Sequence, residues 1–203
     1  MNRAVWLYRE PRSGSTWLCA FLSRILNRKH IFLEYYPNIT LDWKPNDKHS
    51  RLLFSSHRLA YIKPVKMYDD ALLLRCVRRD TFEQMLSAFF YEYNNLLFAN
   101  IQADGDGQTF DRLTQLKVSN VIEDSVKIWL DQKRGFDADW DEFTKDYPSQ
   151  TLYYEDFEQG IQIEGTDIFV QLDNHGTKKL PDYKKKVFTN YDEIKYWYDK
   201  NIP

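Results

Sequence analysis

The sequence predicts an α/β fold built on a sheet of parallel strands. Short apolar runs alternate along the chain with longer segments in which apolar residues recur at helical spacing. The run at 71–77 is almost continuously apolar apart from Arg75, which is typical of a strand buried on both faces of a parallel sheet. Strands that alternate with helices indicate parallel strands joined by helical crossovers.

The N-terminal part of the chain predicts a strand, a tight loop and a helix. The strand covers residues 4–8, and a helical pattern opens near Ser15 and continues to Leu26. Two further apolar runs, at 52–55 and 71–77, predict the next two strands.

A helix is expected over 81–93, where aromatic and aliphatic side chains form one stripe. Asp80 and Glu83 have the spacing of a capping pair at its start. The following segment, around 95–119, is long and polar. Such a loop in a compact domain is usually functional or mobile, so we expect it to cover the substrate.

The C-terminal half predicts three more helices and one strand. The helices cover 120–132 and 137–147, and the strand covers 151–154. A final helix is expected to begin at Asn190, with Glu193 as its capping partner.

Composition narrows the class of protein. A length of 203 residues with 43% hydrophobic content predicts one folded domain, 1–203. The net charge of -2 argues against a general nucleic-acid binder. The chain contains no apolar stretch near the roughly 20 residues of a membrane span and no recognisable signal peptide. Cys19 and Cys76 lie in apolar runs without metal-site spacing, which predicts buried free thiols and a cytoplasmic location.

The segment 11–16, Pro-Arg-Ser-Gly-Ser-Thr, lies where a phosphate-binding loop is expected, between the first strand and the first helix. Backbone N–H groups and the helix dipole favour an anion at such a position. Gly14 permits a close approach, Ser15 and Thr16 add hydroxyl groups, and Arg12 adds a permanent positive charge. A serine follows Gly14 where a nucleoside-triphosphate loop has lysine, so the segment suits a phosphate or sulfate without magnesium. A strand–turn–helix junction that only happens to contain Ser and Gly is the alternative.

Four segments in chain order resemble PAPS-dependent sulfotransferases, where PAPS is 3′-phosphoadenosine 5′-phosphosulfate. Residues 11–18 resemble the family's 5′-phosphosulfate loop. Arg79, followed eight residues later by Ser87, is similar to its 3′-phosphate segment. The Tyr-Glu-Asp-Phe sequence at 154–157 resembles a segment that follows a later strand, and Ser-His at 56–57 lies where many members have Thr-His.

This resemblance implies a three-layer sandwich with a central parallel sheet and a P-loop-like strand–loop–helix. It implies transfer of a sulfuryl group from PAPS to the hydroxyl of a small-molecule or carbohydrate acceptor. The product of the donor would be 3′-phosphoadenosine 5′-phosphate (PAP), and no metal would take part. Arginine at position 12 is closer to the carbohydrate and bacterial trehalose-type members than to cytosolic ones, which usually have lysine.

The resemblance also implies roles for individual residues. Arg12 would stabilise the transferring group electrostatically. Arg79 and Ser87 would hold the 3′-phosphate, since Ser87 lies off the apolar stripe of its helix and arginine suits bidentate phosphate binding; Arg78 could exchange roles with Arg79. The residues expected to bind the donor are Arg12, Ser13, Gly14, Ser15, Thr16, Trp17, Arg79, Ser87 and Tyr154.

His57 is the first candidate for the general base that removes the acceptor proton, because an unperturbed histidine titrates near neutral pH. Glu34 is its rival, since trehalose-type members use a glutamate after the first helix. Two other functional classes stay open. One is a small-molecule kinase with a degenerate phosphate loop, although no lysine occurs between Arg3 and Arg24; the other is a non-catalytic nucleotide-binding module.

Overall fold

The computed structural model describes part of the chain in seven ranges. These are residues 4–35, 52–57, 71–94, 120–145, 147–171, 185 and 188–202. The chain divides into two compact units, of which unit 1 is Met1–Arg79 with Gly135–Leu172, and unit 2 is Asp80–Arg134 with Asp173–Pro203. Each unit has its own hydrophobic core.

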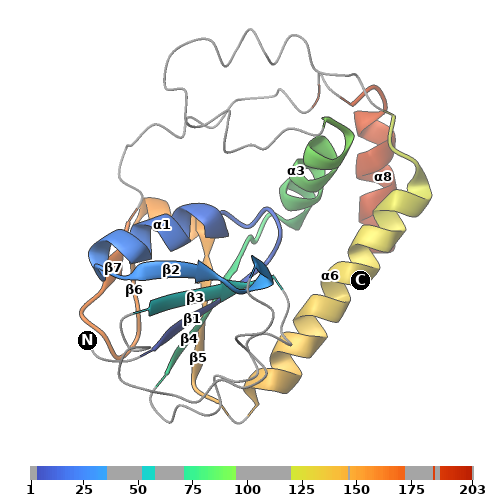
Figure 1. Ribbon diagram of the computed structural model, residues 1–203. Helices are drawn as coiled ribbons and strands as arrows, with labels where there is room; N and C mark the ends of the chain where they lie inside the picture. Colours follow the sequence, from blue (N-terminus) through green and yellow to red (C-terminus); the bar gives the residue numbers. More distant parts are fainter. Residues whose placement is uncertain are drawn as a thin grey trace, which may run out of the picture. The chain divides into compact units, whose positions relative to one another are not determined.

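Unit 1 is built on a five-stranded sheet with the order β2-β3-β1-β4-β5 (Figure 1). The strands are β1 (Val5–Arg9), β2 (Lys29–Phe32), β3 (Leu52–Ser56), β4 (Leu72–Val77) and β5 (Ser149–Tyr153). All four neighbouring pairs are parallel. In the register, Leu7 of β1 lies opposite Ser55 of β3 and Leu74 of β4. The predicted α/β fold with a central parallel sheet is therefore confirmed.

Two helices, α1 (Ser15–Ile25) and α6 (Glu123–Thr144), lie against the two faces of this sheet. The described residues also form the helices α3 (Thr81–Asn94) and α8 (Tyr191–Asn201) of unit 2, and two 3₁₀ segments, η1 (Leu33–Tyr35) and η5 (Tyr154–Glu158). Leu7 belongs to the same core cluster as Leu22 of α1. Its neighbour Tyr8 points to the other face and stacks on Trp140 of α6, with ring centroids 5.5 Å apart. Because both faces are covered, β1 has no polar side to alternate with its apolar one.

Most predicted elements agree with the structure to within one or two residues, but two short pieces were not predicted. Strand β2 has only four residues, two of them Lys29 and His30, so it lacks a strong apolar pattern. The second is an antiparallel pair, β6 (Ile161–Gln162) with β7 (Phe169–Val170).

The prediction of separate helices at 120–132 and 137–147 is wrong, because α6 is continuous. Gly135 lies inside this helix, and a Cβ atom there would meet nothing within 4 Å. A glycine inside a helix costs only about 0.5–1 kcal/mol relative to alanine, which is too little to end a helix that is otherwise well packed.

Unit 2 has a core formed by α3, α8 and the part of α6 that precedes Gly135. The capping role of Asp80 is confirmed, since its Oδ1 accepts a hydrogen bond of 2.8 Å from the backbone N–H of Glu83. Asn190 stands at the N-cap of α8 but makes no side-chain capping bond. Its amide instead bonds both backbone groups of Val121 and the carboxylate of Glu193. The predicted pairing with Glu193 is present, and the predicted cap is not.

Three other expectations concern the chain as a whole. Cys19 and Cys76 are buried free thiols, as predicted. Within the ranges that the structure describes, no helix has both the length and the apolar character needed to cross a membrane. The segment predicted to cover the substrate, 95–119, lies outside the described residues.

Candidate functional site

The loop between β1 and α1 lies at the carboxyl ends of the strands, at the point in the sheet where the strand order reverses. β1 is central, with β3 on one side and β4 on the other. The chain continues from β1 to β2 and β3 and only afterwards to β4. In open α/β sheets, ligands bind beyond the carboxyl ends of the strands at such a switch point. The predicted anion loop therefore occupies the position where this sheet favours a ligand.

The backbone of this loop depends on two residues with positive φ. Gly14, the N-cap of α1, has φ 83°. A Cβ atom there would lie 2.3 Å from Cδ2 of Tyr154, so only glycine fits. Arg12 also has positive φ, at 63°, a conformation that is rare for non-glycine residues and is concentrated at functional sites. The N–H groups of the first turn point out of the start of α1, as in any helix, and Gly14 has no side chain that could accept a hydrogen bond from them.

A partly buried ion cluster holds the start of the loop. The guanidinium of Arg75, in β4, pairs with the carboxylates of Glu10 and Asp137. Arg75 and Glu10 are 5% and 1% exposed. Burial alone lowers the pKa of Arg75, but the two carboxylates outweigh it and hold that pKa above its ordinary value. The backbone oxygen of Glu10 accepts hydrogen bonds from both the N–H and the hydroxyl of Ser13, so the cluster anchors the loop.

Arg9, the last residue of β1, lies under the same loop. It is 8% exposed, and its guanidinium is centred 4.8 Å from the ring of Phe32. Its Nη2 donates a 2.7 Å hydrogen bond to the hydroxyl of Thr16, and its Nε donates to the hydroxyl of Ser15 at 3.3 Å. Arg9 was not among the predicted site residues. Its position could have indicated it, because Arg9 ends the first strand and lies six and seven residues before the two hydroxyl residues at the start of the helix.

His57 follows β3 and is joined to the same arginine. Its Nδ1 lies 2.5 Å from the backbone oxygen of Arg9, and its ring meets Phe32 edge to face at 5.5 Å. A carbonyl oxygen only accepts, so Nδ1 carries the hydrogen. In the neutral ring, Nε2 therefore carries the lone pair that a base requires. Arg9 thus links the anion loop, through its side chain, to the candidate base, through its main chain.

A second histidine, His30 in β2, lies in this region and was not predicted. Its Nε2 is 2.6 Å from the hydroxyl of Ser55. Burial, with a further contribution from the charge of Arg9, lowers the pKa of His30 below its usual value. The environment of His30 therefore favours the neutral form of its ring. Because β2 lacks a strong apolar pattern, nothing in the sequence indicated that His30 lies beside the loop.

Tyr154 and Arg78 lie on the β4 side of the loop. Tyr154 is the residue that a side chain at Gly14 would strike, and the guanidinium of Arg78 lies 4.6 Å from its ring centroid. Trp17 packs at the edge of the core, where it stacks on Phe21 at 5.1 Å. The structure thus brings Tyr154 to the loop, whereas the ring of Trp17 contributes to packing against the core.

Arg79 has a different environment. Both of its terminal nitrogens bond the carboxylate of Asp156, and its backbone N–H donates to Glu155 at 3.1 Å. This contact lowers the pKa of Asp156. Arg79 is thus held by the acidic side chains of the Tyr-Glu-Asp segment, which follows β5.

Two predicted residues remain, Ser87 and Glu34. Ser87 belongs to unit 2, whereas Arg79 belongs to unit 1. Ser87 is also 6% exposed, so the expectation that its place off the apolar stripe leaves it outside the core is wrong. Glu34 lies in η1, directly after β2, and its side chain is outside the described part of the structure.

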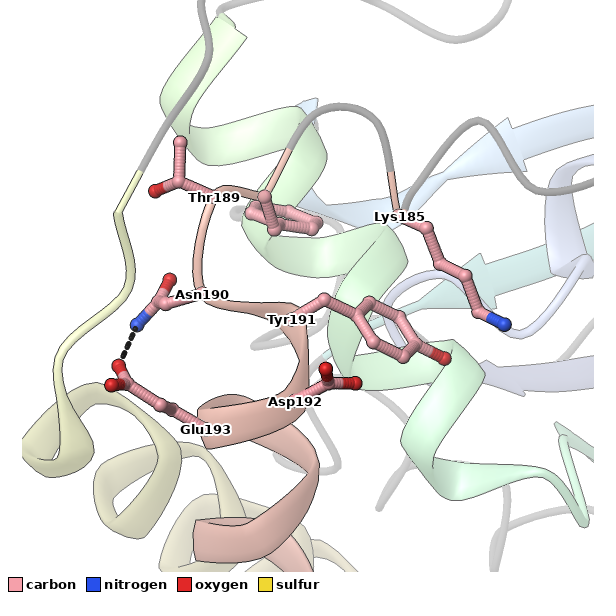
Figure 2. Close-up of a pocket in the computed structure, with 7 residues that line it drawn as sticks. Lys185, Thr189, Asn190, Tyr191, Asp192 and Glu193 are labelled. Atoms are coloured by element: carbon pink, nitrogen blue, oxygen red, sulfur yellow. Dashed lines mark hydrogen bonds between the residues drawn. The ribbon is translucent and has the colours of Figure 1, made fainter.

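A pocket of about 370 Å³ opens elsewhere, in unit 2 at the start of α8 (Figure 2). Asn190 and Glu193 face each other across a hydrogen bond of 3.2 Å there. Lys185, from the lysine run of the tail, lies 5.5 Å from the ring of Tyr191. None of the predicted site residues lines this pocket.

The described ranges hold no group of three or more His, Cys, Asp or Glu side chains arranged for a metal ion. No family model matches the chain, and comparisons with curated proteins and with solved structures found no match.

Proposed function

We propose that this chain is a sulfotransferase that moves a sulfuryl group from PAPS to the hydroxyl of a small-molecule or carbohydrate acceptor. The observation that carries the proposal is the double contact of Arg9. Its side chain holds the hydroxyls of Ser15 and Thr16, and its carbonyl oxygen holds His57. An anion loop and a potential base are thereby fixed to one residue, which is the pair of functions that sulfuryl transfer to a hydroxyl requires.

The loop is suited to the 5′-phosphosulfate. The left-handed Gly14 and the helix start of α1 favour an anion. Arg12 adds a charge that does not depend on pH. In this assignment the fold is a P-loop-like three-layer sandwich, with α1 and α6 against the two faces of the sheet.

In the reaction that we propose, Nε2 of His57 takes the proton of the acceptor hydroxyl while the acceptor oxygen attacks sulfur. The bond between sulfur and the bridging oxygen breaks, and PAP leaves with that oxygen and its electron pair. Arg12 stabilises the charge that develops on the bridging oxygen, as positioned charges do in phosphoryl transfer. The products are the sulfate ester, PAP and one proton.

The turn after β4 is assigned to the 3′-phosphate through Arg79. In the structure this arginine is paired with Asp156 at the surface. An exposed ion pair contributes little to stability, so a phosphate dianion can take the place of the carboxylate. Ser87, the other residue of the predicted 3′-phosphate segment, remains a prediction of the sequence.

Ligand-induced thermal stabilisation tests the proposal without knowledge of the acceptor. PAP, the product, should raise the melting temperature far more than ATP or ADP at equal concentration. At 100 times its Kd, a ligand adds about 2.7 kcal/mol to the free energy of unfolding. The shift should be the same in EDTA as in magnesium. Equal or larger shifts with magnesium–ATP would contradict the proposal and favour a kinase.

Binding of PAP with no transfer to any hydroxyl acceptor would instead favour the non-catalytic module. PAP release from PAPS, measured with a panel of carbohydrates, phenols and small alcohols, separates these two outcomes. The panel also identifies the acceptor.

A further inference from the structure

The hydroxyl of Thr16 has a cation beside it. In nucleoside-triphosphate loops, the Ser or Thr two residues after the last glycine uses its hydroxyl to bind Mg²⁺. Thr16 stands two residues after Gly14, at the same spacing. Here the hydroxyl oxygen accepts a 2.7 Å hydrogen bond from Nη2 of Arg9. The position that a metal ion takes in those loops is therefore next to a guanidinium group.

The chemistry of this hydrogen bond leaves the hydroxyl hydrogen of Thr16 available to another partner. A guanidinium has only donors and keeps its charge at all physiological pH values. The oxygen of Thr16 must therefore accept, and its own hydrogen points away from Arg9. Ser15 is placed in the same way by Nε of Arg9. Hydroxyls fixed as donors suit a fully ionised phosphate or sulfate oxygen, which can only accept.

The same charge opposes a metal ion. A divalent cation bound to the Thr16 oxygen would lie within a few ångströms of the guanidinium, where like charges repel strongly. Arg9 has little freedom to move aside, because it is 8% exposed and its guanidinium lies over Phe32. Its backbone is also held within the sheet, where Arg9 pairs with Cys76 of β4. The cation is therefore a fixed part of the fold.

We propose that Arg9 is the built-in counterpart of the magnesium ion in this loop. It orients the hydroxyls of Ser15 and Thr16 toward the bound anion and makes anion binding independent of divalent metal. The inference rests on the proposed function, since it concerns the anion of the same site. Arg9 is a positioning residue in this account, acting through Ser15 and Thr16.

A double-mutant cycle in anion affinity tests the inference. Inorganic pyrophosphate is titrated calorimetrically in EDTA into the full chain and into Arg9→Met, Thr16→Val and the double variant. Each single change should weaken binding by roughly 10-fold, the usual worth of one hydrogen bond to a charged group. The double variant should bind no more weakly than Arg9→Met, because the contribution of the Thr16 hydroxyl depends on its hydrogen bond from Arg9. Additive losses, or unchanged affinity in Arg9→Met, would overturn the inference.

Two further variants protect the test against a folding defect. Arg24→Met removes the same charge at the far end of α1 and should bind pyrophosphate like the parent chain. If Arg9→Met does not fold, Thr16→Val carries the test alone, since Thr16 is exposed. Thr16→Ser keeps the hydroxyl and should restore the affinity that Thr16→Val loses. Parent-like binding by Thr16→Val would then overturn the inference.

The same titrations with PAP separate this inference from the proposed function. Coupling between Arg9 and Thr16 for pyrophosphate, without any preference for PAP over ATP, would leave the role of Arg9 standing and remove the sulfotransferase. A strong preference for PAP without that coupling would do the reverse. In the parent chain, adding magnesium should not strengthen PAP binding. A tenfold gain with magnesium would overturn the role assigned to Arg9.

Discussion

The loop after β1 and the turn after β4 both place arginines at the carboxyl edge of the sheet, on neighbouring strands. Arg9, the last residue of β1, is buried next to the loop, and its side-chain hydrogen bonds go to hydroxyl groups. In the turn, Arg79 is at the surface, and its hydrogen bonds go to the carboxylates of Glu155 and Asp156. The charge of Arg9 is not neutralised by these contacts, whereas the charge of Arg79 is.

We call the loop a prepared anion site, because its cation is already available to a ligand. The turn is an opened site, because a ligand has to displace a carboxylate from its cation first. A cation whose hydrogen bonds go to neutral hydroxyls keeps its field for an anion. A cation already paired with a carboxylate can bind a phosphate only by exchanging partners. We therefore expect changes around the loop to have large effects on turnover and folding, and changes at the turn to have smaller effects that depend on the ligand.

The largest effect is expected at His57, because it is fixed to the loop through Arg9. His57→Ala should lower turnover about 10²–10⁴-fold, the usual contribution of a positioned general base. PAP binding should be retained. Turnover is measured as PAP release from PAPS with an accepted hydroxyl compound, and the PAP-induced thermal shift shows that the variant is folded.

Glu34→Gln is the matched variant for the rival base. It should lose much less turnover than His57→Ala, since the carbonyl of Arg9 already presents the ring of His57 with its lone pair on Nε2. If Glu34→Gln abolishes transfer while His57→Ala stays active, the roles are reversed. The mechanism would then follow the trehalose-type enzymes.

The ion cluster below the loop gives the next largest effect. Arg75→Met breaks the buried ion pair with Glu10, and breaking such a pair costs about 3–5 kcal/mol. Chemical denaturation should show this loss. Arg75→Met combined with Glu10→Gln should recover part of it, because the second change removes the buried negative charge. Lys145→Met, which breaks an exposed pair with Glu142, is the control and should change stability little.

The sequence located the loop and four of the five strands of the sheet, but not the contacts that prepare the site. Residues 4–8 and 71–77 were predictable because strands buried on both faces have continuous apolar runs. The roles of Arg9 and His30 were not, because they depend on which strands are neighbours. β3 lies between β2 and β1, although in the chain β2 follows directly after α1. Arg75 is an intermediate case, since a charge inside an apolar strand has to be paired, while its partners lie far away in sequence.

Gly14→Ala should have a smaller effect, confined to the loop. Its positive φ costs an alanine about 1–2 kcal/mol, and the new methyl would collide with the ring of Tyr154. We expect lower stability and a loss of PAP affinity. Gly135→Ala is the matched control, since nothing lies near its position in α6. It should raise the free energy of unfolding by about 0.5–1 kcal/mol. If Gly14→Ala also stabilises the protein and binds PAP normally, the loop geometry is not needed for the anion.

The smallest effect is expected at the turn, where Arg79 is exposed and paired with Asp156. Arg79→Met should hardly change the melting temperature, because exposed ion pairs contribute little. It should weaken PAP binding by roughly 10-fold, through the loss of one charged contact. AMP binding should not change, since AMP lacks the 3′-phosphate.

Asp156→Asn provides the opposite test of the same residue. Removing the carboxylate that Arg79 holds frees the guanidinium for the phosphate, so PAP affinity should rise or stay level while AMP affinity is constant. Equal losses of PAP and AMP affinity in Arg79→Met would mean that the residue supports the turn without touching the 3′-phosphate. Arg78, whose guanidinium lies over Tyr154 beside the loop, would then be the arginine to test. In that case the two regions would serve one anion, and the contrast between a prepared site and an opened one would fail.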